Sequence, residues 1–74
     1  MRISDEMVER AAKGLDKKIM QNTYGWSDEE YEIWWNKDPK FVSRETGWGD
    51  GFRGTPKAHL LWMTRITLEA AFKF

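Results

Sequence analysis

The sequence predicts an all-α fold, a compact three-helix domain with a glycine- and aromatic-rich loop, residues 47–54, between the second and third helices. Three observations lead to this fold class. The chain has 74 residues, which suits a single domain over 1–74. Apolar residues recur at the helical spacing of three and four positions. Residues that typically start a helix precede each of these segments. A short β-pair near residues 40–53 is the main alternative for the middle of the chain.

The first predicted helix covers residues 4–22 and begins at Ser4, whose side chain can cap the free amide groups. Asp5 and Glu6 follow in the first turn, where the helix dipole favours acidic side chains. Gly14 weakens this helix and suggests that another element crosses it closely. Asp16 falls on the polar side. The apolar side, which we expect to face the core, consists of Met7, Val8, Ala11, Ala12, Leu15 and Ile19.

The second predicted helix begins at Ser27, which forms a capping-box pattern with Glu30. It should end before Pro39, because a residue that precedes proline avoids the helical region. A helix this short is marginal alone, so we expect it to dock through the aromatic residues on one of its faces. These are Tyr31, Trp34 and Trp35.

The segment between the second and third helices is predicted to be irregular. Phe41 and Val42 suit a short extended piece. Residues 47–54 hold four glycines, which favour turns with positive φ over regular structure. Trp48 and Phe52 lie in this loop and either pin it to the core or face a partner.

The third predicted helix begins at Thr55, an N-cap residue, followed by proline at the first helical position, and runs to Phe74. Its apolar residues cover more than half of its circumference. Two short partner helices would cover less apolar surface than this. The helix is therefore either the central helix of the fold, or part of it contacts another chain. Trp62 lies on the charged side, where we expect it to be exposed or covered by the loop.

The composition excludes several classes of protein. Without cysteine there are no disulfides, thiolate zinc sites or iron–sulfur clusters. The formal net charge is zero, which gives no overall attraction to nucleic acid or to a membrane. No apolar run approaches membrane-spanning length and no signal peptide is evident, so we expect a cytoplasmic protein. The charge is nevertheless uneven, because residues 28–38 hold five acidic residues and one basic residue.

The sequence shows no pattern typical of catalysis or of a cofactor site, so we expect no enzyme activity, no metal and no cofactor. Residues 49–54 match G-x-G-x-x-G, but no βαβ unit surrounds them, and a glycine-rich turn is favoured over a phosphate site assisted by Arg53 and Lys57. His59 is the only histidine and has neither a nearby glutamate nor a nucleophile motif. We therefore expect a packed or partly exposed histidine.

Protein binding is the function class that the residues favour. Five tryptophans in so short a chain exceed ordinary use, and tryptophan is enriched at binding hot spots. A glycine-rich loop and a helix with excess apolar surface also suit a binding protein. The predicted partner contacts are Trp34, Trp35, Trp48, Phe52, Arg53 and Trp62.

Two other readings stay open. A small nucleic-acid-binding accessory protein would use a basic stripe formed by Arg44, Arg53, Lys57 and Arg65. The acidic segment 28–38 opposes this reading. A homo-oligomeric structural protein would instead associate as a homodimer through residues 60–74.

The two ends of the chain resemble short accessory proteins of bacteriophages and prophages. Residues 3–12, ISDEMVERAA, are similar to the opening of many such proteins, and residues 68–71, LEAA, resemble their C-terminal helices. The resemblance covers about a fifth of the chain. It implies an accessory protein that acts inside a bacterial host cell, binds a host protein complex and inhibits it by occlusion. Anti-CRISPR proteins, which act on a defence system, are one such type.

Overall fold

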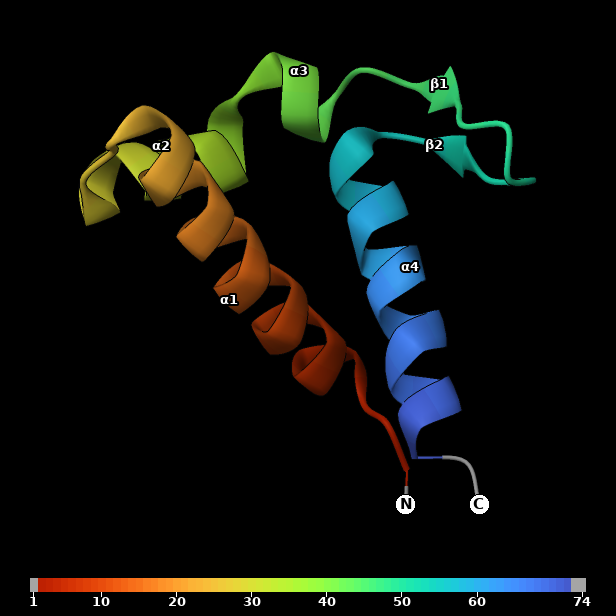
Figure 1. The fold of residues 1–74 in the computed structure, drawn as a ribbon. Coiled ribbons are helices and arrows are strands. Elements are labelled where there is room, and N and C mark those ends of the chain that lie inside the picture. Colours follow the sequence, from red (N-terminus) through yellow and green to blue (C-terminus); the bar gives the residue numbers. More distant parts are fainter. Residues whose placement is uncertain (1, 73–74) are drawn as a thin grey trace.

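The computed structural model describes residues 2–72 and is mainly helical, as predicted. Two long helices lie side by side at one end of the molecule and diverge toward the other, where two shorter helices join them (Figure 1). A two-stranded antiparallel pair stands beside the start of the last helix. The described part of the chain holds α1 (Asp5–Tyr24), α2 (Asp28–Lys37), α3 (Pro39–Val42), β1 (Thr46–Gly47), β2 (Arg53–Gly54) and α4 (Pro56–Ala71).

The three predicted helix starts are confirmed by their caps. The Ser4 and Thr55 hydroxyl groups each accept a hydrogen bond from an amide in the following turn. Ser27 forms the complete capping box. Helix α1 extends two residues further than predicted, to Tyr24, and its C-cap is Gly25, whose φ of 68° lies in the left-handed region. Helix α4 ends at Ala71, and residues 73–74 of the predicted helix lie outside the described residues.

The helix count differs from the prediction, because the segment expected to be extended forms α3. Helix α2 ends before Pro39, as expected, but the proline also starts a new helix. The Asp38 carboxylate caps it by accepting a hydrogen bond from the Lys40 amide, at 2.9 Å. Phe41 is buried as a result, and Val42 packs beside it. An acidic residue followed by proline is itself a helix-start signal, and here it outweighs strand propensity.

The hydrophobic core lies where α1, α2 and α3 meet. Its fully or nearly fully buried members come from these three helices, and α4 contributes the partly buried Leu60 and Leu61. Gly14 does not mark a helix crossing, because a Cβ atom there would find no neighbour within 4 Å. The buried cluster consists of Ala12, Tyr31, Trp35 and Phe41.

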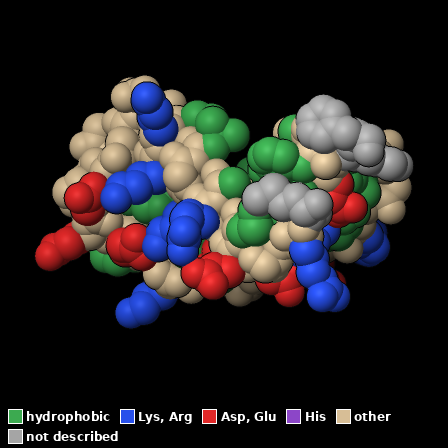
Figure 2. All heavy atoms as spheres, turned by 90° about the horizontal axis from the view of Figure 1, so that it is seen from below, with side chains coloured by type: hydrophobic (Ala, Val, Ile, Leu, Met, Phe, Trp, Pro, Cys, Tyr) green, Lys and Arg blue, Asp and Glu red, His purple; other side chains and the backbone are tan. Residues whose placement is uncertain are grey.

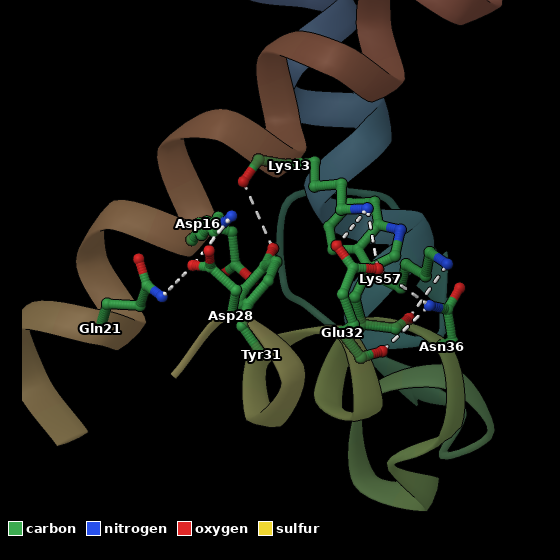
Figure 3. Close-up of polar contacts among 10 residues, drawn as sticks. Lys13, Asp16, Gln21, Asp28, Tyr31, Glu32, Asn36 and Lys57 are labelled. Atoms are coloured by element: carbon green, nitrogen blue, oxygen red, sulfur yellow. Dashed lines mark hydrogen bonds and ion pairs between the residues drawn. The ribbon is translucent and has the colours of Figure 1, made fainter. Parts of the chain in front are cut away.

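A buried carboxylate joins α1 to α2 (Figure 3). Asp16 accepts hydrogen bonds from the Tyr31 hydroxyl at 2.9 Å and from the Trp34 indole at 3.1 Å. The predicted polar side of α1 therefore faces the protein interior at this point. Leu15 and Ile19 were predicted to face the core. Instead, Leu15 is more than half exposed and Ile19 is about half exposed. The reason is that α2 packs on the row of residues containing Asp16, so the neighbouring apolar row stays outside.

The ends of the two long helices are held together by Arg65. Its guanidinium forms an ion pair with the Asp5 carboxylate and donates to the Ile3 carbonyl. These contacts join residues at least 60 positions apart in the sequence. Within residues 2–72, no helix combines the length and apolar character that a membrane span requires.

Candidate functional site

The strands β1 and β2 form a small hairpin that precedes α4. Thr46 pairs with Gly54, and Gly47 pairs with Arg53. The short β-pair that was the alternative for this segment is therefore present. Gly49 and Gly51 in the connecting turn have φ angles of 78° and 94°, a conformation that side-chain-bearing residues rarely adopt.

Asp50 fixes the conformation of this turn. One carboxylate oxygen accepts a hydrogen bond from the Phe52 amide at 3.1 Å, and the other accepts one from His59 Nε2 at 2.6 Å. The hydrogen bond from His59 holds the pKa of the Asp50 carboxyl below its usual value, and the Phe52 amide adds to this effect. The G-x-G-x-x-G turn thus carries its own negative charge, which would repel a phosphate group.

His59 is buried among the aromatic rings of the hairpin and of α4. Its imidazole stacks on the Trp48 indole at 4.2 Å between ring centroids, with 9° between the planes. The Phe52 and Trp62 rings lie at 5.5 Å and 5.9 Å from it, and they stack on each other at 5.1 Å. We call these four residues the aromatic cluster. Its geometry anchors the hairpin to α4 and makes His59 a packed residue, the first of the two states expected from the sequence.

An apolar surface extends from this cluster along α4. The side chain of Trp48 is 38% exposed at the edge of the cluster. Met63 and Ile66 follow His59 and Trp62 by one helical turn and are 40% and 49% exposed. The resulting aromatic face consists of Trp48, Phe52, Trp62, Met63 and Ile66.

The structure divides the predicted partner contacts into two groups. Trp48, Phe52 and Trp62 come together in the aromatic face, and the exposed Arg53 belongs to the same hairpin. Trp62 is covered on one side by the Phe52 ring, which agrees with the expectation of an exposed or loop-covered residue.

Trp34 and Trp35 belong to the core side of the molecule instead. The prediction of a partner contact at Trp35 is wrong, because this side chain is only 1% exposed and cannot reach another protein. Trp34 is partly buried, stacks on Phe41 at 4.6 Å and uses its indole N–H to bind Asp16. A short helix needs such anchors, and α2 uses both tryptophans for its own docking.

The predicted basic stripe does not form. Lys57 donates to the Trp35 carbonyl at 3.1 Å and lies 4.5 Å from the centre of that indole ring. Arg65 is held by Asp5. Arg44 and Arg53 are exposed and form no ion pair within residues 2–72, but two arginines make only a small basic surface.

Sequence reasoning missed three features of this candidate site, namely the Asp50–His59 pair, Met63 and Ile66. The Asp50–His59 pair was overlooked because the search around His59 considered its neighbours in sequence, whereas Asp50 lies nine positions earlier. Met63 and Ile66 were counted only as part of the excess apolar surface of the helix. Their spacing of one turn from His59 and Trp62 was the available signal.

The described residues offer little for metal chemistry. Within residues 2–72, no group of three or more histidine, aspartate or glutamate side chains is placed to hold a metal ion.

Comparison of the chain with protein-family models, with curated proteins and with solved structures gave no match.

Proposed function

We propose that this chain is a small interaction protein that binds a bacterial host protein or complex through its aromatic face and inhibits it by occlusion. The supporting observation is the exposed aromatic and aliphatic surface formed by Trp48, Met63 and Ile66 beside the Phe52–Trp62 stack. Tryptophan anchors surrounded by aliphatic side chains are typical of binding hot spots.

The aromatic face is already organised for binding. The Trp48 indole is held by its stack on His59 and donates to the Gly54 carbonyl at 3.3 Å. The Trp48 amide donates to the Phe52 carbonyl at 3.2 Å, which closes the turn. An anchor that is ordered before binding loses less conformational entropy on association, so more of the contact energy contributes to affinity.

The bacterial host and an anti-defence role, of which anti-CRISPR action is one form, enter this proposal from the resemblance of residues 3–12 and 68–71 to phage accessory proteins. Occlusion suits a chain that exposes aliphatic side chains beside an ordered tryptophan. We propose a cytoplasmic site of action, with neither catalytic residues nor a cofactor.

The test is capture of a partner from bacterial lysate by the tagged protein, with and without nuclease, followed by mass spectrometry. We expect one stoichiometric host protein or complex. Trp48→Ala and Ile66→Glu should each reduce its capture at least about tenfold, the loss typical of a hot-spot residue. Ile33→Glu is the matched control, because Ile33 is 59% exposed on α2 and lies outside the aromatic face.

Two results would contradict the proposal. Equal loss with Ile33→Glu would show that surface charge in general, not the aromatic face, governs capture. Capture that disappears with nuclease would move the assignment to nucleic acid, the alternative that was based on Arg44, Arg53, Lys57 and Arg65. Sedimentation of the free protein completes the test, because a dimer that Ile66→Glu dissociates would assign the face to a second copy of this chain.

A further inference from the structure

A hollow of about 240 Å³ lies between the beginning of α1 and the middle of α4. Figure 2 looks onto this end of the molecule and shows hydrophobic side chains gathered over one half of it, with charged side chains mostly over the other half. The residues that line the hollow include both apolar and charged side chains. Its lining consists of Asp5, Val8, Glu9, Leu61, Trp62 and Arg65.

The charges around the hollow do not cancel. Arg65 forms an ion pair with Asp5 and also donates to the Ile3 carbonyl, so its positive charge is paired. Glu9 is exposed and forms no ion pair within residues 2–72. One carboxylate thus stands uncompensated beside the apolar side chains of Val8 and Leu61.

Trp62 joins the hollow to the aromatic face. Its indole stacks on Phe52 and also borders the hollow. An indole ring attracts cations, and the attraction strengthens where the site is partly removed from water. The hollow therefore presents an aromatic ring and a carboxylate across an apolar floor, a combination that suits a side chain with an apolar stem and a positively charged head.

We propose that this hollow receives an arginine side chain of the protein partner that the aromatic face binds. The arginine stem would lie on Val8 and Leu61, and its guanidinium between Glu9 and the Trp62 ring. Arginine suits the site better than lysine because a planar guanidinium can stack on indole and donate to a carboxylate at once. This inference rests on the proposed function and adds the chemistry of one contact.

The test uses the free protein, labelled with ¹⁵N, and N-acetyl-arginine amide as the probe. We expect saturable shifts of the Trp62 indole resonance and of the Val8, Glu9 and Leu61 amides. N-acetyl-citrulline amide, which has nearly the same shape but no charge, should bind at least about threefold more weakly. Glu9→Gln should weaken arginine binding about two- to fivefold.

Glu6→Gln is the matched control, because Glu6 lies one turn earlier on α1, pairs with Arg10 and does not line the hollow. It should leave arginine binding unchanged. Any one of three results would overturn the inference. The first is resonance shifts scattered over the surface, and the second is citrulline amide binding as tightly as arginine amide. The third is an equal effect of Glu6→Gln and Glu9→Gln on arginine binding.

The two proposals fail in different ways. If arginine amide does not bind but Trp48→Ala still abolishes lysate capture, only the arginine site is refuted. If arginine amide binds the hollow but neither Trp48→Ala nor Ile66→Glu reduces the amount of partner captured, the aromatic face is refuted as the partner surface.

Discussion

Removing the Tyr31 hydroxyl should destabilise the fold by about 2 kcal/mol, because a hydrogen bond to a buried charged group contributes about 1.5–3 kcal/mol. That hydroxyl donates at 2.9 Å to Asp16, whose side chain is nearly buried. In Tyr31→Phe the carboxylate keeps the Trp34 indole as a donor, which limits the loss. For a chain of this length the whole free energy of unfolding is about 4–11 kcal/mol, so the change is large.

Thermal and urea unfolding monitored by circular dichroism would measure this effect. A loss of about 2 kcal/mol corresponds to a fall in Tm of about 8–16 °C for a domain of this size. Tyr24→Phe is the control, because Tyr24 is 62% exposed. A change below about 0.5 kcal/mol in Tyr31→Phe, the range of ordinary surface substitutions, would refute the reasoning.

The same hydroxyl predicts a dependence on alkaline pH. Burial, followed by the hydrogen bond to Asp16, raises the pKa of Tyr31 above its ordinary value of 10.0. A raised pKa means that the folded state retains the proton longer than the unfolded state. The stabilisation is therefore complete below pH about 10 and declines as the pH rises above it. Tyr31→Phe should reduce this alkaline loss of stability, and an unchanged loss would contradict the assignment.

Three further predictions concern the hairpin and the helices. The pKa of Asp50 is lowered from 3.8, so its contacts stabilise the hairpin above that pH and are lost as the pH falls through the lowered value. The Trp48 indole resonance should report this transition, and Asp50→Asn should abolish it. Gly14→Ala should stabilise the protein by about 1 kcal/mol, since Gly14 is exposed within α1 and a methyl group there meets nothing. Gly25→Ala should destabilise it by about 1 kcal/mol, because its φ is 68°. Urea unfolding would measure both changes, and the same sign for both would show that backbone conformation is not the cause.

The local parts of this fold were predictable because their causes lie within a few residues. Ser4, Ser27 and Thr55 cap their helices through amides in the next turn, and Pro39 ends α2 through its own ring. The helix at residues 39–42 was missed because the propensity of Phe41 was weighed above the cap that precedes it.

The parts that depend on neighbours distant in sequence were not predictable from patterns alone. Which of two adjacent rows of α1 becomes buried is decided by where α2 packs, and this packing buries Asp16 while leaving Leu15 exposed. The number of tryptophans was correctly identified as unusual. Residue type alone, however, does not distinguish a tryptophan buried in the core from one exposed at the surface. Trp35 and Trp48 differ only in what folds over them.

The contacts of Arg65 with the beginning of α1 differ from those of the hairpin in the length of chain that they close. Joining residues about 60 positions apart carries a chain-entropy cost that grows with the logarithm of the loop length, whereas the hairpin and its cluster close over far fewer residues. The hairpin therefore closes at a lower entropy cost than the junction of the two long helices. The hollow needs that junction, so local opening of the chain ends would abolish it while leaving the Trp48–His59 stack in place.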